Sequence, residues 1–291
     1  MAVIELQKLT KYYGKHRGIK NITFDIKEGE IFGFIGPNGA GKSTTIRTLL
    51  NFIYPSGGKA FIFGKDVVKD SLAIRRDIGY LPSEVYYYDD MRVSDLLRYS
   101  QAFYKKENSR KMKELADRLD LNLNKKIEDL SFGNKKKVGI IQAMLHEPKL
   151  LILDEPTGGL DPLIRNAFFE LLKEENDRGA TIFFSSHILS EVESMCSRVA
   201  IIKEGELIKV ETIENLIREQ FKKVTITFSS QKGKTFKIEG GKKPEWSGNT
   251  LQLLYRGEMK NMLQKLNEAE VKDLLIEEPS LDEVFMHYYE H

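Results

Sequence analysis

The chain has 291 residues, 41% of them hydrophobic and 30% charged, and its formal net charge is only +2. This composition is typical of a soluble globular protein with one large domain or two smaller ones, and the small charge argues against a protein that coats nucleic acid. No apolar run approaches the roughly 18 residues of a membrane-spanning helix, and we expect no secretory signal. Cys196 is the only cysteine, so no internal disulfide can form and a cytosolic location is expected.

Two alternating stretches, 3–6 and 21–26, predict strands near the start of the chain. Tyr13 lies between them and is followed by a glycine. An aromatic ring upstream of a phosphate-binding loop can stack on a nucleobase. Taken alone, a tyrosine beside a glycine is more often a turn residue.

The next feature is a glycine-rich segment between a predicted buried strand, 31–35, and a predicted helix, 45–50. The segment reads Gly36-Pro37-Asn38-Gly39-Ala40-Gly41-Lys42-Ser43-Thr44. Its pattern and its strand–turn–helix setting are those of a P-loop, whose N–H groups bind phosphate at a helix start. Lys42 can contact the β/γ-phosphates and the Ser43 hydroxyl can bind Mg²⁺.

Further strands are predicted at 59–63 and 78–81, and the spacing then becomes helical from 85 to about 147. This stretch predicts a mostly helical insertion within an α/β domain. One of its predicted apolar faces consists of Val93, Leu96, Leu97, Tyr99 and Phe103. Its last helix follows Ser131, which can cap it, and carries lysines at 135–137. Such a run is usually a solvated face, but this helix start also favours an anion.

Carboxylates follow the strand predicted at 150–153, which is apolar at every position and therefore predicted to be a parallel strand covered on both faces. Asp154 and Glu155 come directly after it, at the sheet edge where ligands bind and where the P-loop also lies. Asp154 can reach a Mg²⁺ ion, and Glu155 can orient or deprotonate a water. A strand at 180–184 leads to His187, which is either structural or a contact to the γ-phosphate and the Glu155 loop.

The composition changes near residue 220. A helix at 163–176, a hairpin at 199–210 and a helix at 212–221 precede the change. We predict strands at 224–228, 235–238, 250–255 and 271–276, helices at 258–268 and 280–289, and a turn-rich segment at 240–248. Trp246 in that segment is predicted to be a packing anchor. The domains expected are therefore an α/β domain at 1–220, with its helical part at 85–147, and a small α+β accessory domain at 221–291.

With these motifs in order, residues 2–220 resemble the ATP-binding subunit of an ABC transporter. The resemblance implies a P-loop ATPase with a mixed sheet core, a helical subdomain, ATP as substrate and Mg²⁺ as cofactor. It implies that Lys42, Glu155 and His187 are catalytic and that Ser43 and Asp154 bind the metal. By the same resemblance Tyr13 stacks on adenine, residues 36–44 bind phosphate, and the signature residues Ser131, Gly133 and Asn134 and the turn residue Asp161 contact ATP across a head-to-tail dimer.

Two motifs depart from the family pattern. The signature is usually Leu-Ser-Gly-Gly-Gln, and here Phe132 and Asn134 replace the first glycine and the glutamine. Ser83 stands after Tyr80-Leu81-Pro82, where the family carries a glutamine that touches Mg²⁺ and the attacking water. Serine is too short to copy it, so either Ser83, through a bridging water, or Glu84 is expected to substitute near the metal.

The stretch 277–285 is similar to the extension of drug- and antibiotic-export subunits that work with ABC-2-type permeases. We therefore expect a subunit that powers export through a separate membrane permease, held at the inner face of the cell membrane by that permease, with a second ATPase subunit and without nucleic acid. Tyr86, Tyr87 and Tyr88 either line the groove for a permease helix or simply pack the insertion. The alternatives are a soluble ABC ATPase acting on ribosomes or DNA, and a regulatory subunit that does not transport.

Overall fold

The computed structural model describes residues 2–104, 108–218, 222–229 and 236–279. The chain divides into two compact units, Met1–Val210 and Glu211–His291. This division falls before the boundary expected near residue 220, because the second unit includes helix α8, Ile213–Arg218. The helix expected at 280–289 lies outside the described residues. Among the helices that are described, none has the length and apolar character needed to cross a membrane.

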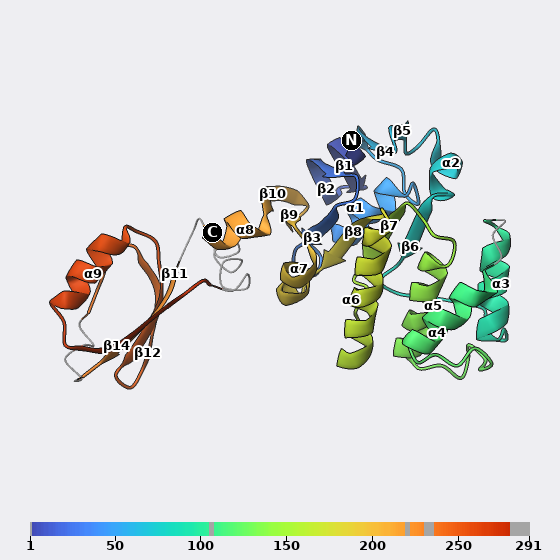
Figure 1. Ribbon diagram of the computed structural model, residues 1–291. Coiled ribbons are helices and arrows are strands. Elements are labelled where there is room, and N and C mark those ends of the chain that lie inside the picture. The colour runs from blue at the N-terminus through green and yellow to red at the C-terminus, as the bar shows by residue number, and fades with distance from the viewer. Residues whose placement is uncertain (1, 105–107, 219–221, 230–235, 280–291) are drawn as a thin grey trace. The chain divides into compact units, whose positions relative to one another are not determined.

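A six-stranded sheet forms one layer of the first unit (Figure 1). Its order is β10-β9-β3-β8-β7-β6, and β3 pairs in parallel with both β8 and β9, as β7 does with β6 and β8. The strands are β3 (Ile31–Ile35), β6 (Ile78–Leu81), β7 (Leu150–Asp154), β8 (Thr181–Ser186), β9 (Arg198–Lys203) and β10 (Glu206–Thr212). Parallel strands end at a common edge, so the segments that follow β3, β7 and β8 meet there.

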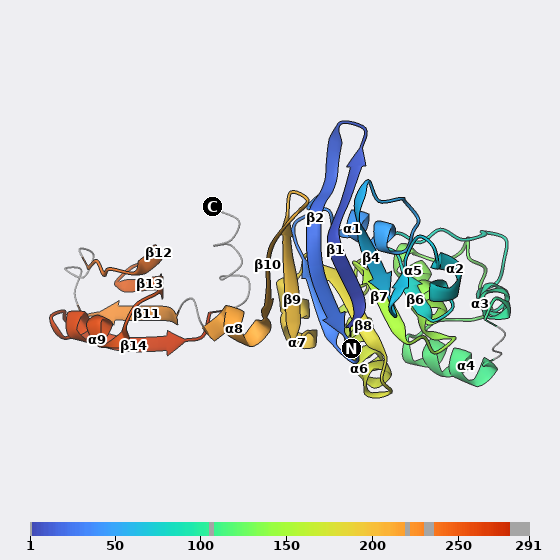
Figure 2. The same ribbon diagram turned by 90° about the horizontal axis from the view of Figure 1, so that it is seen from above.

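A second sheet, with the order β2-β1-β4-β5, is antiparallel throughout. Its strands are β1 (Ala2–Tyr13), β2 (His16–Lys27), β4 (Gly57–Ile62) and β5 (Lys65–Asp66). The long hairpin of β1 and β2 is seen along its length in Figure 2. Both hairpin strands extend well beyond the predicted stretches, because polar residues on the outer face interrupt the apolar alternation.

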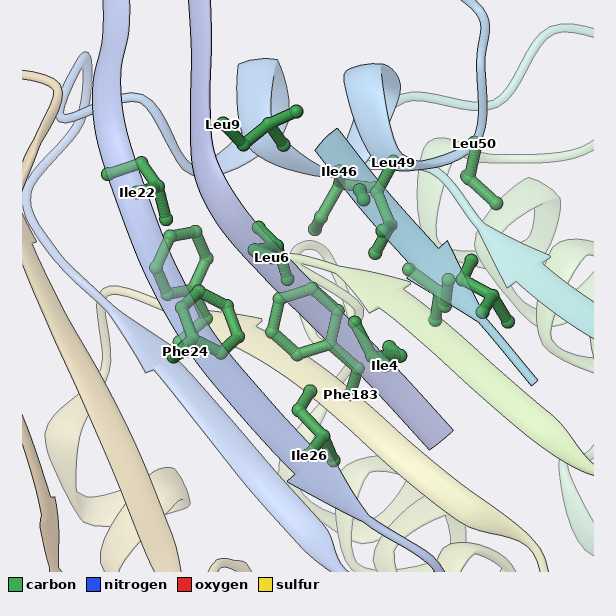
Figure 3. Close-up of a cluster of buried hydrophobic side chains, with 14 of the residues drawn as sticks. Ile4, Leu6, Leu9, Ile22, Phe24, Ile26, Ile46, Leu49, Leu50 and Phe183 are labelled. Atoms are coloured by element: carbon green, nitrogen blue, oxygen red, sulfur yellow. The ribbon is translucent and has the colours of Figure 1, made fainter. Parts of the chain in front are cut away.

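The main hydrophobic core joins the two sheets and the P-loop helix α1 (Lys42–Leu49). Figure 3 shows Phe24 of β2, Phe183 of β8 and Ile46 of α1 within this cluster. The rings of Phe24 and Phe183 have centroids 6.1 Å apart. Burial of aromatic side chains contributes strongly to stability, so this cluster fixes α1 and its preceding loop against the sheet.

Seven more helices belong to the described structure up to residue 218, and three of them, α3, α4 and α5, lie together beside the sheets (Figure 1). The helices are α2 (Ser71–Arg75), α3 (Val93–Ala102), α4 (Ser109–Arg118), α5 (Phe132–Met144), α6 (Pro162–Asp177), α7 (Leu189–Met195) and α8. The helical insertion is thus present as expected. Helix α7 was not predicted, because it is short and its polar residues obscure the helical period.

The predicted apolar face of α3 is partly wrong. Val93, Leu96 and Leu97 are buried, but Tyr99 and Phe103 are exposed, and their rings meet edge to face with centroids 5.1 Å apart. Residues 99 and 103 share one side of the helix, which is rotated away from the buried stripe. The insertion therefore presents aromatic side chains on its surface.

The second unit contains an antiparallel sheet of order β12-β13-β11-β14 and helix α9 (Met259–Asn267). Its strands are β11 (Lys222–Phe228), β12 (Gly241–Ser247), β13 (Thr250–Tyr255) and β14 (Val271–Glu277). A core of eight buried residues packs the sheet against α9.

The prediction for the region before β13 is wrong. The segment 241–247 is a strand rather than a turn, and residues 236–238 lie in no strand. Strand β12 forms because it pairs with β13, and it tolerates Pro244 because it is an edge strand with an irregular register. Trp246 stacks on Phe228 with ring centroids 5.7 Å apart, so its predicted packing role is confirmed.

Candidate nucleotide site

The P-loop connects β3 to α1 at the common edge of the parallel strands. Gly41 precedes the helix with φ +108°, and a Cβ atom there would lie 2.8 Å from Cγ2 of Ile19. Only glycine adopts this conformation in so close a space. No side chain caps α1. The N–H groups of its first turn are therefore suited to an anion, which the helix dipole also favours.

Lys42 is buried and directs its ammonium group back over the loop. Its Nζ donates to the carbonyl oxygens of Gly36 at 2.6 Å and Pro37 at 3.1 Å, and it lies 2.9 Å from Oε1 of Glu155. The lysine thus links the P-loop to the residue that follows β7. A buried ammonium needs such partners, since an unpaired one is costly.

Glu155 connects Lys42 to His187. Nδ1 of His187 lies 2.5 Å from Oε2 of Glu155, whereas Lys42 contacts the other carboxylate oxygen, Oε1. The backbone of Glu155 has φ +49°, a conformation that a residue with a side chain rarely adopts. Its N–H donates to both the carbonyl and the hydroxyl oxygen of Ser185, which holds this conformation. Strain of this kind is concentrated at functional sites.

Asp154 is buried at the end of β7. Its Oδ1 accepts a hydrogen bond of 2.7 Å from the Ser185 hydroxyl, whereas its Oδ2 has no hydrogen-bond partner among the described residues. Burial and the charge of Asp154 together raise the pKa of the neighbouring Tyr80 to about 12. A buried carboxylate oxygen without a hydrogen bond is a suitable ligand for a hard cation.

A cavity of about 410 Å³ joins these elements. Of the residues predicted from the sequence, it is lined by Tyr13, Asn38, Gly39, Gly41, Lys42, Ser43, Thr44, Ser83 and Glu155. Tyr13 and the P-loop thus border the same space, although they come from different parts of the chain. Ser83 lines the cavity, whereas Glu84 does not and instead accepts a hydrogen bond from the hydroxyl of exposed Tyr86.

Several predicted site residues do not line this cavity: Gly36, Pro37 and Ala40 of the P-loop, Asp154 and His187 at the sheet edge, and Ser131, Gly133, Asn134 and Asp161. The Ser131 hydroxyl caps α5 by accepting from the N–H of Asn134, and the Asp161 carboxylate caps α6 by accepting from the N–H of Ile164. The exposed ring of Phe132 lies against Gly159, where a Cβ atom would be 2.5 Å from Cδ1 of the ring. The signature segment therefore packs on the turn before Asp161.

The sequence did not reveal Arg17, Gly18 or Glu191. Arg17 and Gly18 line the cavity, and Arg17 pairs with Glu206 at 3.0 Å. Buried Glu191 accepts hydrogen bonds from Thr157 at 3.0 Å and Ser186 at 3.2 Å, and its burial raises its pKa. It thereby joins the turn after Glu155 to the residue before His187. No local pattern marks these residues, because their contacts are distant in sequence.

The residues present fit a nucleoside triphosphate and a magnesium ion. The uncapped helix start and buried lysine suit phosphate, and the cavity extends from them to Tyr13. No cluster of three or more acidic, histidine or cysteine side chains that could hold a metal by itself occurs in the described ranges. Mg²⁺ is often held by one or two protein oxygens together with substrate phosphates, and Ser43 and Asp154 suit that arrangement.

The fold and the cavity define a P-loop nucleotide-binding protein. The family model described as ABC transporter matches residues 19–158. The chain is 35% identical to the linearmycin resistance ATP-binding protein LnrL of Bacillus subtilis, over 74% of this chain and 70% of LnrL. It is 37% identical to the bacitracin transport ATP-binding protein BcrA of Bacillus licheniformis, over 79% and 76% of the two chains.

Solved structures agree with these relatives. One of an ATP-binding subunit of an ABC transporter has a TM-score of 0.70 and 32% identity, and the match covers 74% of this chain and 92% of that one. The dimeric ABC transporter cassette MJ0796 has a TM-score of 0.66 and 27% identity, over 72% and 98%. The chain belongs to the ABC transporter family, as one of its ATP-binding subunits, and it is an ATPase.

Proposed function

We propose that this subunit powers the export of antibiotics or related compounds through a separate permease of the ABC-2 type. The observation that carries this proposal is its similarity, across most of both chains, to subunits of bacitracin transport and linearmycin resistance. The tail at 277–285, of which residues 280–285 lie outside the described structure, is the sequence feature that favours an ABC-2-type permease. Through that permease the subunit is held at the inner face of the membrane.

We assign the chemistry to the three side chains that meet at the sheet edge. Lys42 offsets the charge of the β/γ-phosphates, as the P-loop N–H groups do. Glu155 orients the attacking water and accepts its proton, and His187 contacts the γ-phosphate while holding the carboxylate through their 2.5 Å contact. The segment carrying Ser83 closes this part of the cavity.

Mg²⁺ held by Ser43 and Asp154 would neutralise negative charge on the phosphates when bound. The Ser185 hydroxyl orients the Asp154 carboxylate by donating to Oδ1, so Oδ2 would be available as a ligand when the cation is bound.

Tyr13 is proposed to stack on the adenine. Tyr13→Ala should then raise the Kd for ATP about 10-fold or more, because base–aromatic stacking contributes about 1–3 kcal/mol. Tyr13→Phe keeps the ring and should bind ATP nearly as well as the wild type. Tyr12→Ala is the matched control, since this neighbouring tyrosine does not line the cavity. Equal binding of ATP by the Tyr13→Ala and wild-type chains in a fluorescence titration would contradict this role.

Two subunits are proposed to meet head to tail, with each ATP between the P-loop of one and the signature segment of the other. This arrangement accounts for the position of Ser131, Gly133, Asn134 and Asp161 outside the cavity of their own chain. MJ0796, a structural relative, forms a dimer. ATP binding closes such a pair because the nucleotide contacts both halves only when they are closed, and hydrolysis releases it.

A cavity of about 650 Å³ borders the helical part and is proposed to receive a cytoplasmic helix of the permease. Many of its lining residues are aromatic, and they include Tyr86, Tyr88, Tyr99 and Phe103. Tyr86 and Tyr88 are 84% and 64% exposed, whereas Tyr87 is largely buried and its hydroxyl lies near Gly139. The tyrosine run therefore combines packing with an exposed aromatic surface of the kind found at interfaces.

The double variant Tyr86→Ala/Tyr88→Ala should lose co-purification with the permease while the chain still folds and binds ATP. Tyr87→Ala should instead lower the melting temperature, because it removes a partly buried ring and costs up to about 3 kcal/mol, the lower end of the range for a fully buried aromatic side chain. Pull-down with the tagged permease and a thermal melt distinguish the two effects. Retention of both transport and co-purification by the double variant would exclude this surface as the docking site.

Export itself is tested in inside-out membrane vesicles that contain the permease and the full chain. We expect ATP-dependent accumulation of an antibiotic such as bacitracin or linearmycin in the vesicles, and none with the Glu155→Gln chain. If a panel of peptide and polyketide antibiotics accumulates to the same extent in vesicles with and without the wild-type chain, the export proposal is contradicted.

A further inference from the structure

Lys136 is the middle residue of the lysine run in α5 and is 0% exposed. Its Nζ donates to two backbone carbonyl oxygens, those of Pro82 and Ser83, each at 2.8 Å. The two adjacent lysines have partners within the helical part itself, since Lys135 pairs with Asp89 and Lys137 donates to the carbonyl oxygen of Asp120. Of the three lysines, only Lys136 bonds residues 82 and 83, which come directly after β6.

That segment is a wall of the nucleotide cavity, because Ser83 lines it together with Lys42 and Glu155. It follows Leu81 of β6, which pairs with Leu153, the residue before Asp154. The charges of Asp154, Glu155 and Glu84 all act on the Lys136 ammonium group. Lys136 is therefore bonded to this wall and lies within electrostatic reach of Asp154 and Glu155.

Burying a lysine side chain costs more free energy than burying an apolar side chain of the same size. Its desolvation disfavours the charged amine and lowers the pKa of Lys136 to about 8. Replacing a buried charge with an apolar side chain of similar volume is often neutral for stability or stabilising. The two bonds are thus better explained by the position that they impose than by the stability that they add.

We propose that Lys136 is a positioning residue of the ATPase, which ties helix α5 to the Pro82–Ser83 wall of the nucleotide cavity so that helix and wall move together. The two hydrogen bonds are accepted by backbone carbonyls, so they do not depend on the Ser83 side chain, which is too short to reach far into the cavity. Helix α5 starts directly after Ser131 of the signature segment. A movement of that segment would therefore be transmitted through α5 and the two Lys136 hydrogen bonds to the nucleotide cavity of the same chain. This last consequence rests on the proposed two-subunit site.

The position of the wall is tested first, in the full chain without nucleotide. Lys136→Met keeps nearly the same side-chain length and removes the ammonium group, so both hydrogen bonds are lost. Lys137→Met is the matched control, because it changes another buried lysine on the same helix. We expect amide hydrogen exchange at residues 83–85 to be about 10-fold faster in Lys136→Met, since hydrogen bonds from a charged donor are among the stronger ones and their loss makes local opening easier. The same residues should exchange at the wild-type rate in Lys137→Met. Unchanged exchange in Lys136→Met would overturn the proposal.

Measurement of kcat distinguishes a positioning role of Lys136 from a contribution to stability alone. Lys136→Met should lower kcat about 10- to 100-fold through misplacement of the wall, while the Kd for ATP stays within about threefold. Lys136→Gln, whose amide keeps N–H donors, should recover part of the loss, and Lys137→Met should keep the wild-type kcat. Equal losses in Lys136→Met and Lys137→Met would overturn the assignment. If Lys136→Met does not fold, Lys136→Gln decides through the same two measurements, and neither measurement depends on whether the protein exports a substrate.

Discussion

Replacing Glu155 with glutamine is expected to lower kcat for ATP about 10²- to 10⁴-fold, the range attributed to a positioned general base. The amide has the shape of the carboxylate and can still contact His187, but it cannot accept a proton from water. ATP binding should be retained or tightened, because the carboxylate no longer competes with phosphate for Lys42, from which it lies 2.9 Å away. Turnover by a coupled enzyme assay and a binding titration on the same sample measure both effects.

The matched control is Glu174→Gln, which neutralises a carboxylate on α6 that pairs with Arg118 outside the nucleotide cavity. It should hydrolyse ATP at the wild-type rate. Hydrolysis by Glu155→Gln at that same rate would remove Glu155 from the mechanism and leave the base unassigned.

Lys42→Met is expected to raise the Kd for ATP about 100-fold and to abolish measurable turnover. Removing one partner from a buried, hydrogen-bonded charge pair costs about 2–5 kcal/mol, and this lysine also supplies a positive charge within the phosphate-binding loop. Methionine preserves the buried stem, so the chain should remain folded. The experiment compares Kd values from calorimetry with those of Lys149→Met, which removes an exposed lysine paired with Asp77. Wild-type affinity in Lys42→Met would contradict the assignment of this loop to phosphate.

The sequence predicted which residues lie at the common edge of the parallel strands, because each of these segments is recognised by a local pattern. An apolar strand followed at once by Asp154 and Glu155 places both carboxylates at a known end of a parallel strand. The same reasoning applies to the P-loop after β3 and to His187 after β8. Their mutual contacts then follow from the pairing of β8 with β3 and β7.

The supporting residues could not be predicted, because their roles depend on contacts between distant segments. Lys136 bonds carbonyl groups 53 and 54 residues earlier in the chain, and Glu191 accepts a hydrogen bond from Thr157, 34 residues away. Side-chain type suggests neither partner. The run of three lysines is consistent with a solvated face, yet the middle lysine is fully buried.

In the second unit, pairing between strands overrides the local sequence preferences. Strand β12 contains Gly241 and Pro244, both typical of turns, and its pairing with β13 overrides those preferences. The exposure of Tyr99 and Phe103 likewise depends on how α3 packs, which its composition does not determine.

The central claim is that each ATP is shared between the P-loop of one subunit and the signature segment of another. It is tested most directly by mixing two inactive variants, Lys42→Met and Ser131→Asp. Aspartate keeps the helix cap and places a negative charge against phosphate. In a mixed pair one site carries both changes and the other carries neither, so random pairing should restore about one quarter of the wild-type turnover. A mixture as inactive as either variant alone would contradict the shared site.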